Sequence, residues 1–159
     1  MMMLASEVIS RLQGKTLVTA ESCTGGAIGA ALTAVPGASN VYKGGIISYC
    51  NDVKNSMLGV SELLLKEVGA VSAPVAEAMA NGARVALKAD VAISVTGLAG
   101  PAGDDYGNPV GTVYIGYADK DRCLHRHFCF NGDRDAVRSA AVAEALNLIL
   151  DVFKENSAV

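Results

Sequence analysis

Val91-Ala-Ile-Ser-Val-Thr96 is the stretch of sequence that decides the fold class of this chain. It is a continuous run rich in β-branched residues, which is typical of a strand covered on both faces at the centre of a sheet. The segment that follows, from Gly97 to Gly111, is rich in Gly, Pro and Asp and is expected to form a long loop. Connections of this length are often functional in a compact domain.

Apolar runs alternate with helical patterns on both sides of this strand. The other expected strands cover residues 15–22, 42–49, 112–119 and 122–130. A short amphipathic helix comes first in the chain, and further helices are expected over residues 24–35, 53–58, 61–68, 72–88, with Ser72 as N-cap, and 133–154. This order predicts an α/β fold, a three-layer α/β/α sandwich with a mixed, partly parallel sheet. The first two strands are joined by a helical crossover and are expected to be parallel.

Composition places the 159 residues in one domain, 1–159, that is long enough to bury a core. The hydrophobic share of 51% is typical of a compact α/β protein and is compatible with a homo-oligomer. A net charge of −3 predicts no binding to nucleic acid, whereas a small phosphorylated ligand needs only one or two local cations. The N-terminus has no signal-peptide pattern and the apolar runs are short, so we expect a cytoplasmic protein without a membrane partner.

The cysteines and acidic residues indicate no metal site. Cysteines stand at positions 23, 50, 123 and 129, without C-x-x-C spacing, and are expected to be free thiols in a reducing cytosol. The alternating Cys-x-His-x-His-x-Cys segment 123–129 leaves a zinc site open, but alternate residues of one strand converge poorly on a single ion. Asp104 and Asp105 are adjacent acids of the kind usually found solvated in loops. No metal site is therefore expected.

Ser22 is a candidate nucleophile because it stands where a strand gives way to a helix. The residues after it include Thr24, Gly25 and Gly26, whose backbone N–H groups can face a phosphate or an oxyanion at the start of the helix. Glycines also let the backbone approach a ligand closely. The alternative is that this segment is only a helix cap with glycines for close packing.

Lys54 is the candidate base for that nucleophile. A serine hydroxyl needs a base at neutral pH, and a lysine serves if burial lowers its pKa. Lys54 follows the strand that ends at Tyr49, and parallel neighbouring strands would bring Ser22 and Lys54 to the same carboxyl edge of the sheet. Tyr49 can pass a proton or hold the ammonium group. The alternatives are that Lys54 is an exposed surface lysine, or that His125 or His127 supplies the base.

Two further groups of residues are candidates for binding a substrate. In the long loop, Gly97 and Gly100 can offer backbone N–H groups to an anion or an amide, unless the loop is only a flexible connection. Arg134 and Arg138 share one face at the start of the last helix, where cations oppose the helix dipole. That placement indicates binding of a phosphate or carboxylate, with an ion pair to Asp133 or Asp135 as the alternative.

These segments together resemble the CinA C-terminal domain family, the bacterial nicotinamide-nucleotide amidases. The matching stretches run in family order: Ala20–Gly26 (AESCTGG), Tyr49–Lys54 (YCNDVK), Leu58–Val60 (LGV), Val71–Ala76 (VSAPVA), Thr96–Pro101 (TGLAGP), Pro109–Val113 (PVGTV) and Gly132–Arg138 (GDRDAVR). The resemblance implies a Ser/Lys hydrolase that converts nicotinamide mononucleotide to nicotinic acid mononucleotide and ammonia without a cofactor. It implies Ser22 as nucleophile, Lys54 as base and Tyr49 as a supporting hydroxyl. It also implies a substrate-binding arginine, with Arg134 preferred over Arg138.

The chain departs from the family pattern at three positions. Asp104 and Asn108 stand where the family loop often carries glycine and lysine, and Cys50 stands where a small hydroxyl residue is common. The first two bear on affinity for the substrate phosphate and on substrate choice. Two other functions stay open: a non-catalytic nucleotide-binding or regulatory domain, and an amidase for a different amide. The larger family protein also has an N-terminal pyrophosphatase-like domain, which a chain of this length is too short to hold.

Overall fold

A mixed sheet runs through the middle of the computed structural model, which describes the backbone of residues 1–156 and the side chains through Lys154. The strands are β1 (Leu17–Glu21), β2 (Tyr42–Ile47), β3 (Val91–Gly97), β4 (Thr112–Ala118) and β5 (Cys123–Cys129), in the spatial order β2-β1-β3-β4-β5. β1 pairs in parallel with both β2 and β3, whereas β4 is antiparallel to β3 and β5. The predicted mixed, partly parallel sheet is confirmed.

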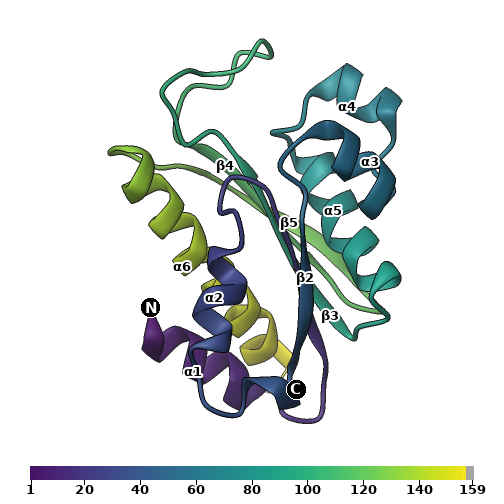
Figure 1. The fold of residues 1–159 in the computed structure, drawn as a ribbon, viewed down its shortest axis with the longest axis vertical. Coiled ribbons are helices and arrows are strands. Elements are labelled where there is room, and N and C mark those ends of the chain that lie inside the picture. The colour runs from purple at the N-terminus through teal and green to yellow at the C-terminus, as the bar shows by residue number, and fades with distance from the viewer. Residues whose placement is uncertain (157–159) are drawn as a thin grey trace.

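Helices cover both faces of this sheet (Figure 1). They are α1 (Met2–Arg11), α2 (Ala27–Thr33), α3 (Asn51–Leu58), α4 (Glu62–Val68), α5 (Ala73–Ala86) and α6 (Arg134–Asn156), with a short 3-10 turn, η1, at Ala38–Asn40. α1, α2 and α6 lie against one face, and α3, α4 and α5 lie against the other. The three-layer α/β/α sandwich is therefore also confirmed. None of the helices in residues 1–156 combines the length and apolarity that a bilayer crossing needs.

β3 is the central strand, as its composition predicts, and residues 91–96 are all buried. Successive side chains point to opposite faces, so Ile93 and Val95 join the apolar core beneath α6 and α2. Ser94 and Thr96 point the other way. Their hydroxyls donate hydrogen bonds of 2.6 Å to the Ala76 carbonyl and 2.8 Å to the Ala70 carbonyl, which ties α5 and the segment before it to the strand.

The start of α2 and the capping of α5 differ from the sequence-based prediction. The helix expected from Thr24 begins only at Ala27, because Gly25 and Gly26 adopt positive φ angles of 60° and 101° and make a turn instead. Ser72 does occupy the N-cap position of α5, but its hydroxyl donates to the Gly69 carbonyl and caps no helical N–H group. It therefore closes the preceding turn.

The three parallel strands end at the same edge of the sheet. Ser22 follows β1 there, α3 follows β2 after a short connection, and the loop of residues 98–111 follows β3. The carboxyl ends of parallel strands are where open α/β sheets bind their ligands. The sheet direction alone therefore brings the three candidate segments into one region of the molecule.

Candidate active site

Ser22 and Lys54 meet at this edge. The Lys54 Nζ atom lies 3.1 Å from the Ser22 Oγ atom, which is within hydrogen-bond distance. Ser22 is held at the end of β1 by a 3.0 Å hydrogen bond from its own N–H to the Val95 carbonyl. Lys54 reaches it from the first turn of α3, and its side chain is only 1% exposed. This geometry matches the expectation that both residues lie at one sheet edge. It does not match the alternative that Lys54 is an exposed surface lysine.

The surroundings of Lys54 favour its neutral form. Burial lowers the pKa of Lys54 below that of an exposed lysine, and the nearby thiols of Cys50 and Cys23 oppose this only in part. Within the described residues no carboxylate lies within ion-pair distance of the amine. Its second partner is the Ser48 carbonyl, at 2.7 Å. A neutral amine can donate one N–H to that carbonyl and still accept the hydroxyl proton of Ser22.

The turn after Ser22 offers fewer free N–H groups than the sequence indicates. The Gly25 N–H donates to the Ser22 carbonyl, and the Gly26 N–H donates to the Glu21 carboxylate at 3.0 Å. In contrast, the Cys23 and Thr24 N–H groups donate to no backbone carbonyl in the described chain. Thr24 is fully buried and does not line the cleft beside Ser22, so of these two N–H groups only that of Cys23, a residue that the sequence did not single out, is available to an oxyanion.

A cleft of about 280 Å³ lies beside the Ser22–Lys54 pair. Its lining combines the end of β1, the start of α3, the loop after β3 and the start of α6: Ser22, Cys23, Tyr49, Asn51, Lys54, Ala70, Val71, Thr96–Gly100, Ala102 and Arg134. Gly97 must be glycine, because a Cβ atom there would lie 2.7 Å from the Val113 side chain and 3.0 Å from the Thr112 carbonyl. Gly100 also lines the cleft, and its carbonyl accepts a hydrogen bond from Arg134.

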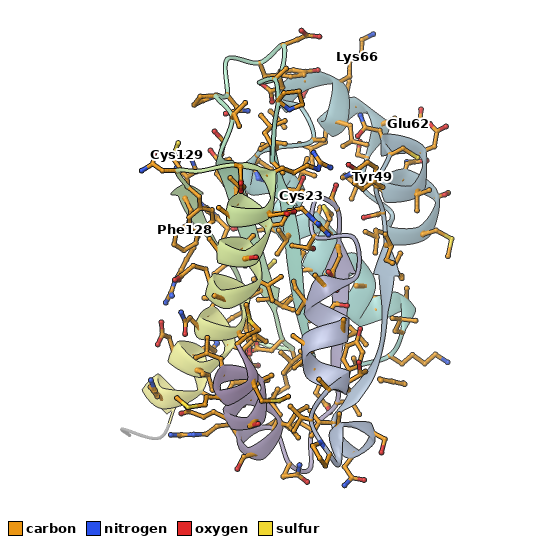
Figure 2. The ribbon with its side chains drawn as sticks, turned by 60° about the vertical axis from the view of Figure 1, so that its left-hand side comes forward. Cys23, Tyr49, Glu62, Lys66, Phe128 and Cys129 are labelled. Atoms are coloured by element: carbon orange, nitrogen blue, oxygen red, sulfur yellow. The ribbon has the colours of Figure 1, made fainter. Side chains whose placement is uncertain are left out.

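Tyr49 and Arg134 form a bridge across the mouth of the cleft. The Arg134 guanidinium donates to the Tyr49 hydroxyl at 2.9 Å and to the Gly100 carbonyl at 2.8 Å. Tyr49 is 61% exposed and makes no hydrogen bond to Ser22 or Lys54 within the described residues. Figure 2 shows Tyr49 and Cys23 at the same end of the sheet. Tyr49 thus borders the cleft, and its partner is the arginine.

Arg138 is directed elsewhere. Its guanidinium donates to the Cys23 carbonyl at 3.1 Å and to the Thr24 carbonyl at 3.2 Å, from behind the turn that follows Ser22. The Asp135 carboxylate lies 3.9 Å from the Arg138 guanidinium. Arg138 therefore makes the ion pair considered for it in addition to those two hydrogen bonds. Arg138 does not line the cleft, whereas Arg134 does. Of the two arginines, only Arg134 is therefore placed to touch a molecule in the cleft.

Several other candidates lie outside the cleft. On β5, the His125 Nδ1 atom is 2.8 Å from the Glu77 carboxylate, and the His127 ring stacks on Tyr114. Neither histidine is hydrogen bonded to Ser22 within the described residues, where no cluster of His, Cys, Asp and Glu suited to a metal ion occurs either. The cysteines are all free thiols, and burial raises the pKa of Cys23 to about 11.

The two unusual loop residues pair with each other. The Asp104 carboxylate accepts hydrogen bonds from the Asn108 side chain at 2.8 Å and from the Asn108 N–H at 2.9 Å. The Asn108 side chain also donates to the Val71 carbonyl at 3.1 Å, and the Tyr106 hydroxyl donates to the Lys66 carbonyl of α4. Neither Asp104 nor Asn108 lines the cleft. Asp104 and Asn108, the two loop residues that depart from the family pattern, therefore anchor the loop.

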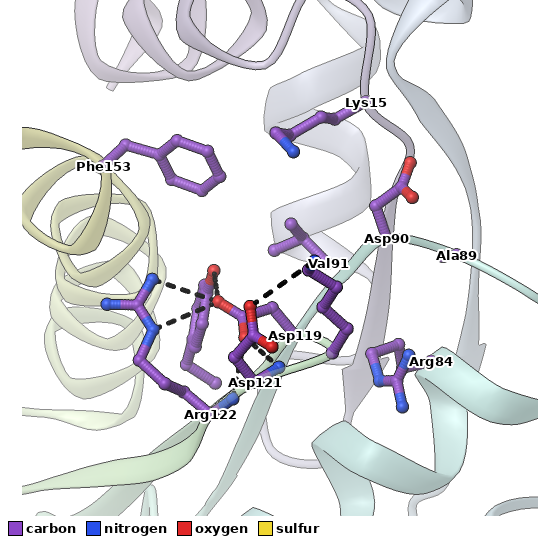
Figure 3. A pocket seen from close by; sticks show the side chains of 11 residues that line it. Lys15, Arg84, Ala89, Asp90, Val91, Asp119, Asp121, Arg122 and Phe153 are labelled. Carbon is purple, nitrogen blue, oxygen red and sulfur yellow. Dashed lines mark hydrogen bonds and ion pairs between the residues drawn. The ribbon is translucent and has the colours of Figure 1, made fainter. Parts of the chain in front are cut away.

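A cavity of about 500 Å³, larger than the cleft, lies at the opposite end of the sheet and is drawn in Figure 3. Its carboxylates are already engaged: Asp119 accepts from Tyr117 and Arg122, and Asp90 accepts from the N–H and hydroxyl of Thr16. It contains no serine–lysine pair. The smaller cleft at the carboxyl edge is therefore where the reactive groups converge.

Comparison with known proteins bears on this site. The family model described as the CinA C-terminal domain matches residues 2–153. Nicotinamide-nucleotide amidohydrolase PncC of Escherichia coli (strain K12) is 43% identical over 148 residues, which are 92% of this chain and 90% of that protein. A CinA-like protein of Synechococcus sp. (strain RCC307) is 47% identical over 150 residues, which are 92% of this chain but 36% of that protein. The chain spans about a third of the length of such CinA-like relatives.

The same fold occurs in solved structures. The crystal structure of a competence-damaged protein (CinA) superfamily member from Klebsiella pneumoniae 700603 superposes with a TM-score of 0.94 at 32% identity. The superposition covers 97% of this chain and 98% of that one.

Proposed function

Since this chain belongs to the CinA C-terminal domain family, we propose that it is an amidohydrolase that deamidates nicotinamide mononucleotide to nicotinic acid mononucleotide and ammonia. The observation that carries the proposal is the 3.1 Å approach of Lys54 Nζ to Ser22 Oγ at the cleft. The match to PncC supports the choice of substrate, because it extends over nearly the full length of both proteins. The activities of the longer CinA-like relatives are not part of the proposal.

The first half of the reaction forms an acyl-enzyme. Neutral Lys54 takes the hydroxyl proton as Ser22 Oγ attacks the carboxamide carbon of the nicotinamide ring. The N–H group of Cys23, which lines the cleft, stabilises the oxyanion, a role in which one donor contributes about 3 kcal/mol. The C–N bond then breaks, and ammonia leaves with the proton that Lys54 returns.

The second half restores the enzyme. Lys54 removes a proton from a water molecule, the hydroxide attacks the acyl carbon, and the bond to Ser22 Oγ breaks with return of the proton to that oxygen. Nicotinic acid mononucleotide is released. These steps use no metal or organic cofactor. The reaction fits salvage of pyridine nucleotides in the cytoplasm, and a homo-oligomer is compatible with it.

Arg134 is the proposed contact for the substrate phosphate. Its present partners, the Gly100 carbonyl and the Tyr49 hydroxyl, carry no charge, and within the described residues it makes no ion pair. A guanidinium with an unneutralised charge at the mouth of a cleft suits a phosphate, which it can bind with two parallel hydrogen bonds. Tyr49 would then orient the guanidinium.

Ammonia release from nicotinamide mononucleotide tests the proposal. The wild-type protein should release ammonia, whereas Ser22→Ala and Lys54→Ala should lose at least about 1,000-fold in kcat because nucleophile and base act as a unit. Lys120→Ala is the matched control, since this lysine lies in the remote β4–β5 turn with its side chain 84% exposed. That variant should keep wild-type activity.

Two other results would point to the alternatives. Thermal stabilisation of the wild-type protein by the mononucleotide without ammonia release would indicate a binding domain. Ammonia release from another pyridine nucleotide or from free nicotinamide, but not from the mononucleotide, would indicate an amidase for a different amide.

A further inference from the structure

Glu21 is a buried carboxylate next to the proposed nucleophile. It is the last residue of β1, it directly precedes Ser22, and its side chain is 1% exposed. Within the described residues, no cation lies within ion-pair distance of it. An ionised carboxylate in such a position needs other partners, because burying an unpaired charge is costly.

Its partners are backbone N–H groups at the start of α2. The Glu21 carboxylate accepts hydrogen bonds from Gly26 at 3.0 Å, Ile28 at 3.1 Å and Gly29 at 2.9 Å. Gly26, in the N-cap position of α2, has no side chain to cap the helix. Glu21 therefore caps α2 from the far side of the turn and compensates its charge with the helix N-terminus.

The span between these attachment points contains Ser22. On one side, the Ser22 N–H is bonded to the Val95 carbonyl of the central strand. On the other, the Glu21 carboxylate holds Gly26 and α2, and the Gly25 N–H is bonded to the Ser22 carbonyl. The turn is thus closed at both ends, which restricts the directions that Ser22 Oγ can take toward Lys54 Nζ. It also uses up the first N–H groups of α2, so that an oxyanion in the cleft is left with that of Cys23.

We infer that Glu21 is a positioning residue, which aims Ser22 Oγ at Lys54 by clamping the turn between β1 and α2. This inference rests on the proposed function, because it assumes that Ser22 is the nucleophile. It differs from a role in stability alone. A helix cap that only stabilises would change the fraction of folded protein, whereas a positioning residue changes the reactivity of each folded molecule.

Glu21→Gln is the discriminating variant, because it keeps the shape of the side chain but turns an NH2 group toward at least one of the three N–H donors. Asp90→Asn is its matched control. Asp90 also accepts hydrogen bonds from neighbouring backbone and side chain, those of Thr16, but it does so at the opposite end of the same two strands. Both variants exchange a hydrogen-bonded carboxylate for an amide.

Two rates are measured on folded protein below its melting temperature. One is turnover of nicotinamide mononucleotide. The other is labelling of Ser22 by a fluorophosphonate, in which the Ser22 Oγ–P bond forms, the P–F bond breaks and the hydroxyl proton passes to Lys54. We expect Glu21→Gln to lower kcat and the labelling rate by about 100-fold, as a misplacement of about 1 Å does, with KM changed less than about threefold. Asp90→Asn should leave kcat, KM and labelling unchanged.

Wild-type labelling and kcat in folded Glu21→Gln would overturn the inference. If Glu21→Gln does not fold, Glu21→Asp decides, since it keeps the charge on a shorter arm. A folded Glu21→Asp with reduced labelling supports positioning. A folded Glu21→Asp that is labelled at the wild-type rate would show that Glu21 is only a structural cap. Failure of both variants to fold would lead to the same conclusion.

Labelling also separates this inference from the choice of substrate. If the wild-type protein is labelled at Ser22 but releases no ammonia from the mononucleotide, the proposed substrate is wrong and the labelling rates still decide the role of Glu21. If it shows neither activity, Ser22 is not a nucleophile, and the inference about Glu21 fails with it.

Discussion

Lys54 combines burial with the absence of a nearby negative charge, and both determine how the protein responds to pH. In the proposed mechanism the unprotonated amine is the base, and burial lowers the pKa of Lys54 from its ordinary value. We therefore expect kcat/KM to rise with pH through the lowered pKa and to level off below about pH 10, the range of an exposed lysine. A pH–rate profile checks this. A profile that keeps rising to the ordinary lysine range would contradict it, and Lys54→Arg should be inactive throughout because arginine stays protonated.

The lowered pKa of Lys54 also makes the free energy of unfolding depend on pH. Between the lowered pKa of folded Lys54 and the ordinary value of about 10.4, the unfolded chain binds more protons than the folded one. The contribution of Lys54 to the free energy of unfolding therefore increases with pH across that window. In urea titrations, the free energy of unfolding of the wild-type protein should rise relative to that of Lys54→Met as the pH is raised. A constant difference would mean that folded and unfolded Lys54 titrate alike.

Arg134 and Arg138 look equivalent in the sequence, but their substitution should change different kinetic constants. Loss of the Arg134 guanidinium removes the proposed ionic contact to the substrate phosphate, so Arg134→Ala should raise KM about 10- to 100-fold, the equivalent of a charged hydrogen bond. Steady-state kinetics with nicotinamide mononucleotide measure this. Arg126→Ala, which breaks a half-buried pair with Asp151 remote from the cleft, is the control and should leave KM unchanged. Because Arg138 holds the turn carbonyls of Cys23 and Thr24, Arg138→Ala should lower kcat more than it raises KM.

At the scale of elements, the position of α3 matters most because this short helix carries Lys54. α5 lets it approach closely through Gly82, where an added Cβ atom would collide with the Leu58 carbonyl at the end of α3. Elsewhere in a helix, replacing glycine by alanine stabilises by about 1 kcal/mol. Here overpacking, which costs about 1–3 kcal/mol, opposes that gain. The close crossing of α3 and α5 therefore depends on one glycine.

Gly82→Ala should lower the free energy of unfolding and, by displacing α3, lower kcat about tenfold or more. Denaturant titration and ammonia release measure the two effects. Asn81→Ala is the neighbouring control, since it is exposed on the same helix and should alter neither. A more stable Gly82→Ala with wild-type kcat would show that α3 accommodates the methyl group without moving Lys54.

At the scale of the whole molecule, the direction of the strands places the candidate catalytic groups at one end of the sheet and not at the other. β1, β2 and β3 all finish at the edge that holds Ser22 and Lys54. At the other end lies a cavity of larger volume, in which the Asp119 carboxylate is bonded to Tyr117 and Arg122 (Figure 3). The Asp90 carboxylate there is bonded to Thr16. Size therefore does not locate the chemistry in this fold. The convergence of Ser22, Lys54 and Arg134 on one cleft at the carboxyl edge does.

Much of this arrangement could be predicted from the sequence. The central place of β3 follows from its run of β-branched residues, and the strands, the hairpin and most helices follow from patterns within a few neighbouring residues. The meeting of Ser22 and Lys54 was also predictable, because parallel direction alone sends both segments to one edge. Such features depend on local pattern or on topology, and both can be inferred from the order of residues.

Only the tertiary structure decided which side chains face one another at that edge. The Ser48 carbonyl accepts a hydrogen bond from Lys54, and Arg138 donates to the carbonyls of Cys23 and Thr24. Glu21 caps α2 across the turn that contains Ser22. Tyr49 pairs with Arg134, 85 positions away in the chain. The sequence by itself determined the layers, the sheet and the edge at which Ser22 and Lys54 lie. The structure decided these pairings, because a side chain's direction is set by how elements distant in the chain pack, and no local pattern contains that information.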